Sequence, residues 1–186
     1  MRSCEIDGLA AANNASWCDA VCRANGVVAA SSEDLWWSST RTLPLYPDAV
    51  TLRQTVSAEQ VVSAIDGSAG ASVKDSFACL DLTAYGFFVL FDARWVSWEA
   101  VPLPAPDTLW RGVTTPDALA TWVDTHGDGP PLPPALLRNP RVTLLAADAD
   151  QGTGSDAVCG GRGRRRGQPL PGGGLADVAL RRMVLL

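Results

Sequence analysis

The chain has 186 residues, of which 47% are hydrophobic, including seven tryptophans. This length and composition predict one folded domain, with at most an appendage, and exclude a disordered chain. The formal net charge of −5 argues against a surface built to bind nucleic acid, and no apolar run approaches the ~20 residues of a membrane-spanning helix.

The first seventeen residues contain acids and asparagines where an export signal would have an apolar core. The five cysteines are odd in number and scattered along the chain. Reduced thiols in a cytoplasmic protein are therefore expected.

Residues 8–25 are predicted to form a helix, with Asn13 or Asn14 as a cap and Gly26 as a left-handed C-terminal stop. Its expected apolar stripe has helical spacing and consists of Trp17, Val21 and Ala24.

Cys18 and Cys22 lie four residues apart and share one face of this helix. Two thiolates could bind a metal if Cys4 or His126 completed the set. Cysteine also packs as a small hydrophobic residue, and metal-binding pairs are usually closer in sequence. We favour packing and expect no metal.

A short helix is predicted around residues 33–37, followed by an extended loop that enters a strand at residues 49–52. Pro44 and Pro47 keep the residues before them extended. The aromatic residues of this region could line a ligand pocket or cover one end of the core; we favour the core.

The clearest helix is predicted at residues 57–66. Ser57 followed by Gln60 is a capping-box pattern, and Gly67 ends the segment. The expected buried face consists of Val61, Val62 and Ile65.

Residues 72–96 are predicted to form two strands at the centre of a mixed or antiparallel sheet, joined near residues 83–86. The first strand would bury Phe77, Cys79 and Leu82. The unbroken apolar run from Phe87 to Phe91 is typical of a strand that is covered on both faces.

A further helix is predicted at residues 116–125, with Thr115 as its cap, and a further strand at residues 141–147. Helices therefore alternate with strands, which predicts an α/β fold. Residues 176–186 could add a short helix or strand.

The charge changes sign at about residue 150. Through Gln151 there are eighteen acidic and nine basic residues, whereas beyond it there are two acidic and six basic residues. The arginines cluster as Arg162 and Arg164–Arg166, without aromatic partners for stacking bases, so we favour a solvated tail over a nucleic-acid site. We predict a core at residues 1–150 and an irregular, Gly/Arg-rich tail at residues 151–186.

Catalytic patterns are weak in this sequence. His126 is the only histidine and follows a predicted helix, and no GxSxG element is present. Covalent catalysis is therefore disfavoured. The neighbouring charges Lys74 and Asp75, like Asp92 and Arg94, could act as acid and base, although ion pairs at strand ends are more common.

Four segments carry a resemblance to a known family: NNASWCDAVCRANG, RTLPLYPDAVTL, SVKDSFACLDLTAYGFFVLFDARWV and ALLRNPRVTLLAADAD. Together they resemble uncharacterised actinobacterial proteins related to the GNAT (GCN5-related N-acetyltransferase) acyltransferases, over residues 10–150. The resemblance implies a mixed, mostly antiparallel sheet flanked by helices. It also implies acetyl-CoA or another acyl-CoA as co-substrate and a small-molecule or peptide amine as acceptor.

The sequence departs from this family where the cofactor would bind. GNAT enzymes hold the acyl-CoA pyrophosphate on backbone N–H groups at a helix start, after a Q/R-x-x-G-x-G/A loop. The nearest match, residues 164–169, ends in proline and does not lead into a helix. We hypothesise that the residues after about 150 are a frameshifted or degenerate remnant of a longer parent.

Two functions are compatible with these features of the sequence. One is a GNAT-like acyltransferase, in which an amine attacks the acyl-CoA thioester directly with a carboxylate or a water relay as base. The other is a non-catalytic or truncated relative that acts as a binding or interaction module. The predicted substrate contacts, at strand ends beside the aromatic loop, are Tyr46, Asp48, Lys74 and Asp75.

Overall fold

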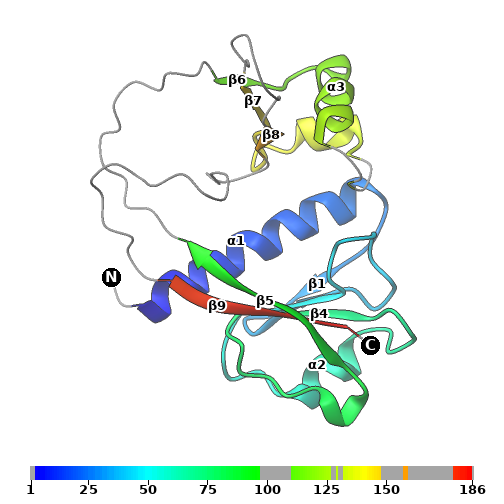
Figure 1. Cartoon of the computed structure of the whole chain (residues 1–186). Helices are drawn as coiled ribbons and strands as arrows, with labels where there is room; N and C mark the ends of the chain where they lie inside the picture. The colour runs from blue at the N-terminus through cyan, green and yellow to red at the C-terminus, as the bar shows by residue number, and fades with distance from the viewer. Residues whose placement is uncertain are drawn as a thin grey trace. The chain divides into compact units, whose positions relative to one another are not determined.

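The computed structural model describes residues 3–96, 110–126, 129, 132–147, 157–158 and 178–185 (Figure 1). The chain divides into two units, one formed by Met1–Glu99 with Gly174–Leu186 and the other by Ala100–Gly173. The described residues form a mixed α/β structure with three α-helices and a mostly antiparallel main sheet, as predicted. Within the described part of the chain, no helix is both long and apolar enough to cross a membrane.

The first unit is built on a six-stranded sheet with the order β1-β2-β3-β4-β9-β5. Its strands are β1 (Ala30–Ser31), β2 (Leu35–Trp37), β3 (Ala49–Thr51), β4 (Ser72–Asp75), β5 (Phe88–Val96) and β9 (Val178–Leu185). All neighbours pair antiparallel except β3 and β4, which are parallel and are connected through helix α2 (Ala58–Ala64).

Helix α1 (Ser3–Ala24) packs on one face of this sheet and α2 on the other (Figure 1). The predicted helix is confirmed, but it starts earlier, so Asn13 and Asn14 lie inside it and do not cap it. Its C-terminal stop is confirmed: Gly26 has φ +80°, and Val27 N–H donates to the Cys22 carbonyl.

The buried stripe of α1 differs from the prediction. Val21 is buried as expected, but Trp17 and Ala24 are only half-buried. The residues that meet the sheet are smaller: Ala15, Cys18 and Cys22 pack with sheet residues, and Ala11, one turn earlier, is also buried. Small side chains let the helix approach the sheet closely, and Cys18 and Cys22 pack there with Trp36 and Val50.

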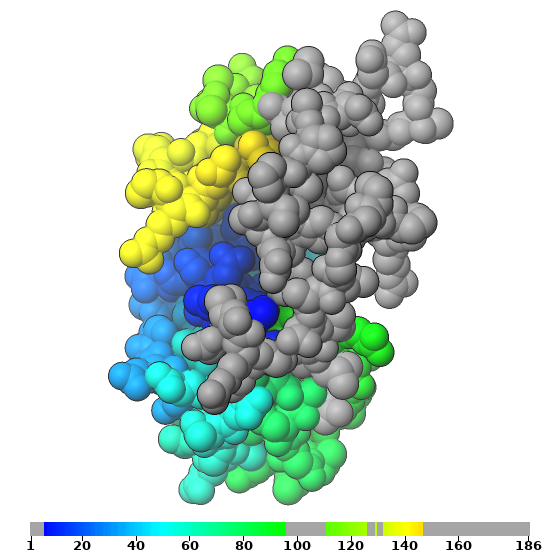
Figure 2. All heavy atoms as spheres, turned by 90° about the vertical axis from the view of Figure 1, so that its left-hand side faces the viewer, coloured from blue at the N-terminus to red at the C-terminus, as the bar shows by residue number. Residues whose placement is uncertain are grey.

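The capping box of α2 is confirmed in both directions. Gln60 N–H donates to Ser57 Oγ at 3.2 Å, and Ser57 N–H donates to Gln60 Oε1 at 2.8 Å. The helix buries Val61 fully and Val62 partly against β2, β3 and β4. Figure 2 shows the cyan residues around α2 and the green residues that follow β4 as one continuous surface.

The predicted short helix at residues 33–37 is wrong. Ser32 Oγ accepts from Leu35 N–H, which closes a turn, and Leu35–Trp37 then form β2. Alternation explains the strand, because Leu35 and Trp37 pack on the α2 side of the sheet and Trp36 packs on the α1 side.

The two strands predicted within residues 72–96 exist, but they are not neighbours. The C-terminal strand β9 lies between β4 and β5 and pairs antiparallel with both. β5 is therefore at the edge of the sheet. Phe87, just before the strand, is buried, but Phe88–Phe91 are 45–54% exposed, so the prediction that this apolar run is covered on both faces is wrong. The first strand also ends at Asp75, so Phe77 and Cys79 lie beyond it; Cys79 is exposed, whereas Leu82 is buried as predicted.

The second unit contains helix α3 (Pro116–His126), as predicted, and a three-stranded antiparallel sheet. Its strands are β6 (Trp110–Gly112), β7 (Leu145–Ala147) and β8 (Ala157–Val158), so the strand predicted at 141–147 is confirmed only at its end. Two short 3₁₀-helices complete the described elements: η1 (Thr83–Tyr85) in the first unit and η2 (Pro134–Arg138) in the second. Trp122 Nε1 donates to the Leu145 carbonyl at 3.1 Å, which ties α3 to β7.

Candidate functional site

Three of the four predicted substrate contacts lie at the two ends of one pair of strands, and Lys74 lies inside β4. Tyr46 and Asp48 come just before β3, at the end where Ser72 begins β4, whereas Asp75 ends β4 beside Thr51. The parallel pairing of β3 with β4 keeps these ends apart by the length of the strands. The structure therefore brings Tyr46 and Asp48 together but does not form one cluster from all four residues.

Asp48 is buried, with 1% of its surface exposed, and its carboxylate is surrounded by donors. Oδ1 accepts from Thr42 N–H at 2.8 Å and from Thr42 Oγ1 at 3.1 Å. Oδ2 accepts from Ser72 N–H at 2.9 Å and forms an ion pair with Arg41 Nη1. These bonds tie the proline-rich loop to the start of β4.

Arg41 extends this network to the loop that precedes β4. Its Nη2 donates to the backbone carbonyl and to the hydroxyl of Ser68, both at 2.9 Å. Sequence reasoning missed the pairing of Arg41 with Asp48. The sequence signal for this pairing was an arginine and an aspartate seven residues apart with two prolines between them. A loop of that kind can fold back so that the residues at its two ends come into contact.

Asp75 is fully buried and plays the corresponding role at the other end of the strands. Oδ2 accepts from Leu80 N–H at 2.7 Å, and Oδ1 accepts from Phe77 N–H at 3.1 Å and from Thr51 Oγ1 at 3.3 Å. The carboxylate thus fixes the loop that leaves β4. A signal for this role is the position of Asp75 just before a loop whose N–H groups need acceptors.

Lys74 is half-buried on the α1 face of the sheet, in register with Val50. Its Nζ lies 5.2 Å from the centre of the Trp95 ring, within the range of a cation–π interaction. Trp95 Nε1 in turn donates to the Ser76 carbonyl at 3.2 Å. Lys74 therefore helps to connect β4 to β5 across the intervening strand β9.

Tyr46 stabilises the loop through its backbone carbonyl and the core through its side chain. Its carbonyl accepts from Thr42 Oγ1 at 2.8 Å, and its side chain packs at the margin of the cluster beneath α1. The aromatic residues Trp36 and Tyr46 thus belong to the core, as favoured from the sequence.

The two cysteines of α1 pack in the core, which is the role favoured from their sequence. Burial raises the pKa of Cys18 from 9.0 to about 12, and nearby Lys74 offsets only part of that effect. Burial also raises the pKa of Cys22, to about 11. Both thiols are protonated at neutral pH, so neither is an activated nucleophile.

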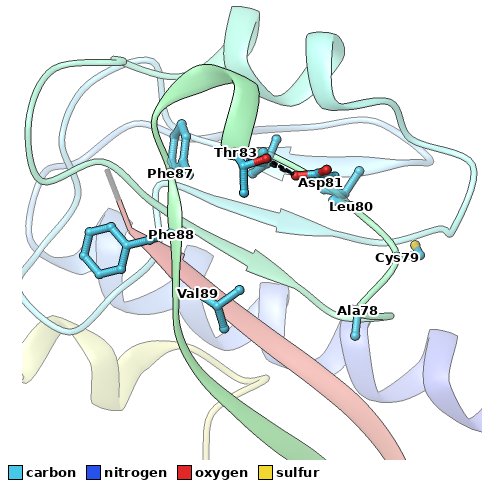
Figure 3. Close-up of a pocket in the computed structure, with 9 residues that line it drawn as sticks. Ala78, Cys79, Leu80, Asp81, Thr83, Phe87, Phe88 and Val89 are labelled. Carbon is cyan, nitrogen blue, oxygen red and sulfur yellow. Dashed lines mark hydrogen bonds between the residues drawn. The ribbon is translucent and has the colours of Figure 1, made fainter.

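A pocket of about 320 Å³ lies between the loop after β4 and the start of β5 (Figure 3). In this view Phe87, Phe88 and Val89 line one wall of the pocket, and the loop residues Ala78, Cys79 and Leu80 line the other. Its volume is at the lower end of the range for small-molecule sites.

The polar groups of this pocket serve the loop itself. Asp81 Oδ1 accepts from the N–H and the Oγ1 of Thr83, at 3.0 and 2.6 Å, which forms a local turn. The Cys79 thiol lies 3.7 Å from the Gln54 carbonyl, and its pKa is raised, first by burial and then by Asp75. The lining therefore supplies mainly apolar contact, and the raised pKa of Cys79 disfavours its thiolate at neutral pH.

Several predicted features fall outside the described residues. The arginine cluster at 162–166 lies there, as do the side chains of Cys4 and His126. Among the described residues, no group of three or more metal-ligating side chains is assembled. Comparison of the chain with protein-family models, with curated proteins and with solved structures found no match in any of the three.

Proposed function

We propose that this chain is a non-catalytic binding or interaction module, related to the GNAT acyltransferases that its sequence resembles. The observation that supports this proposal is the burial and the hydrogen bonding of the two predicted carboxylates. Asp48 and Asp75 are buried, and donors of the protein itself surround their oxygens. A base for an attacking amine must come within hydrogen-bond reach of that amine, and these two carboxylates support loops instead.

The start of α2 is the natural place to test the fit of an acyl-CoA. The loop from β3 to α2 follows the family pattern at its first position, Arg53, and at its last, Ala58, but it has Val56 where the pattern has glycine. Val56 is 4% exposed and belongs to the core. A pyrophosphate needs backbone N–H groups that a glycine leaves accessible, and this loop has a buried core valine at the glycine position.

The capping box also occupies part of this helix start. Gln60 N–H and Ser57 N–H donate to side chains of the box itself. Arg53 lies near Glu33 and Asp34, with N···O distances of 3.6 and 3.7 Å. The residues present therefore do not fit the pyrophosphate of an acyl-CoA, which supports the non-catalytic function.

A GNAT-like acyltransferase is the second candidate, and the sheet favours it. Three antiparallel strands lead into a parallel pair that is joined by a crossover helix, within a mostly antiparallel sheet flanked by helices. In this candidate an acyl group would pass from the acyl-CoA thioester to the amine of a small molecule or peptide.

Thermal unfolding with acetyl-CoA distinguishes the two candidates. A ligand at a hundred times its dissociation constant stabilises a protein by about 2.7 kcal/mol, which raises the Tm of a chain of this size by roughly 5–11 °C. We expect no rise at millimolar acetyl-CoA, with ATP as the control for unspecific anion binding. A rise with acetyl-CoA that ATP does not reproduce, and that Arg53→Ala reduces, would support the acyltransferase and contradict our proposal.

A further inference from the structure

Strand β5 forms one edge of the six-stranded sheet. It pairs with β9 from Phe88↔Leu185 to Val96↔Val178, and no other strand that the structure describes pairs with its second side. Figure 1 shows β5 in green running beside β9 in red. The outward backbone N–H and C=O groups of an edge strand can accept another strand.

The side chains at the start of this edge are apolar and exposed. Phe88, Val89, Leu90 and Phe91 each have between 45% and 54% of their surface exposed. Natural proteins usually protect an edge strand with charges, prolines or a short length, whereas β5 has nine residues and four consecutive apolar ones. A contiguous apolar patch of this kind marks an interaction surface.

The sequence of β5 is complementary to itself when two copies run antiparallel. If the symmetry axis passes through Ala93, Asp92 lies opposite Arg94 of the second copy, and Arg94 lies opposite the second Asp92. Phe91 then lies opposite Trp95, also twice. Opposite charges and aromatic pairs that face each other across a strand pair stabilise it.

Neighbouring registers lack this complementarity. An axis through Asp92 or through Arg94 places like charges opposite each other, which destabilises a strand pair. The favoured register also uses the regular part of β5, because the irregularity in its pairing with β9 lies earlier, between Val89 and Phe91.

We propose that the partner of this edge is a second copy of the chain, joined through antiparallel pairing of β5 with β5. The two six-stranded sheets then form one continuous sheet around a twofold axis, as in an isologous dimer. This proposal rests on the proposed function, since it names the partner of the interaction module. The charge pattern of Asp92 and Arg94 selects a second copy over an unrelated strand.

Charge reversal in the full chain tests the pairing. Asp92→Arg places arginine opposite arginine and Arg94→Asp places aspartate opposite aspartate, so each variant is expected to weaken the dimer at least tenfold in sedimentation velocity. The double variant Asp92→Arg/Arg94→Asp restores opposite charges and should recover the dimer. An equimolar mixture of the two single variants should form a heterodimer, because each chain then opposes the other's charges.

Glu59→Arg on α2 is the matched control for Asp92→Arg, since it makes the same change in charge at an exposed position on another element. It should leave the dimer unchanged, and circular dichroism should show that every variant is folded. A wild-type chain that is monomeric up to hundreds of micromolar, or a dimer that both single variants leave intact, would overturn the second copy as partner. The acetyl-CoA experiment decides the proposed function separately, because its readout does not depend on the oligomeric state.

Discussion

Replacement of Asp75 by asparagine tests whether this carboxylate is structural. Asparagine keeps the shape of the side chain but replaces one acceptor oxygen by a donor. The amide oxygen can keep the 2.7 Å bond from Leu80 N–H, but the amide NH₂ then faces Phe77 N–H, which loses its acceptor. The site is fully buried, so water does not replace the lost partner.

The magnitude follows chiefly from the bond that Phe77 N–H loses. Thr51 Oγ1, which donates to the same oxygen at 3.3 Å in the wild type, can instead accept from the new amide group. A hydrogen bond to a charged group contributes about 1.5–3 kcal/mol, and a buried unsatisfied donor costs a similar amount. We expect Asp75→Asn to lower the free energy of unfolding by about 2–3 kcal/mol, which lowers Tm by roughly 4–12 °C.

The assay is urea unfolding followed by circular dichroism, with Asp81→Asn as the matched control. Asp81 is exposed, and asparagine can keep its Oδ1 bond to Thr83 N–H, so the control should change stability by less than about 0.5 kcal/mol. If Asp75→Asn is as stable as the wild type, the carboxylate is not needed by the loop and our reason for excluding it from chemistry is wrong.

Three further predictions concern α2, α1 and a buried thiol. Ser57→Ala removes the acceptor of Gln60 N–H and should destabilise the protein by about 1 kcal/mol in urea unfolding, whereas Ser63→Ala on the exposed face should have little effect. Gly26→Ala places a side chain at φ +80° and should cost about 1 kcal/mol through backbone strain alone, because an added Cβ meets no atom within 4 Å; an unchanged Tm would refute the left-handed stop. The pKa of Cys18 is raised from 9.0 to about 12 on folding, so its contribution to stability is fully present below pH 9 and is lost as the pH rises from 9 towards 12, by up to about 1.4 kcal/mol per pH unit. Cys18→Ala should therefore flatten the alkaline fall of stability, and an identical pH profile would contradict the burial of this thiol.

Local signals in the sequence predicted the three α-helices, although they misplaced the start of α1 and predicted a helix where β2 lies. These signals are the capping box at Ser57 and Gln60 and the glycine after α1. Each involves residues within a few positions of one another, so it can be recognised from the sequence without knowledge of the fold. The strand β2 was missed because its residues, Leu35 to Trp37, are apolar on both sides of the sheet and show no polar alternation. A three-residue apolar segment has no distinct period, and tertiary packing decides its structure.

The insertion of β9 between β4 and β5 could not be read from the sequence for a different reason. This pairing joins residues about a hundred positions apart, and the apolar pattern of residues 178–185 suits an edge, a centre or a short helix equally. The order of strands in a sheet depends on such distant pairing, for which the hydrophobic pattern of one segment is no guide.

The carboxylates show why the predicted site and the structure diverge. From the sequence, Asp48 and Asp75 are acids at strand ends, the places where substrate-binding groups often gather. Their actual partners are N–H groups of the loops that they join: Thr42 and Ser72 for Asp48, Phe77 and Leu80 for Asp75. A loop that leaves a short strand has the same need for an acceptor as a substrate has, so residue type and position cannot separate the two roles.

The apolar run of β5 is also ambiguous, because its sequence does not say what covers it. The charges of Asp92 and Arg94 indicate the answer. Four consecutive apolar residues predict burial, but the pattern is identical whether the cover is the chain's own helix or another molecule. Asp92 and Arg94 follow at a spacing of two residues, which has no consequence inside one strand, since both side chains lie on the same face. Within the chain, Asp92 lies in register with Arg182 of β9, whereas Arg94 lies opposite Leu180. An antiparallel copy of β5 adds an opposite charge to the outer side of Asp92 and also supplies one for Arg94, which favours a second copy as the cover of this edge.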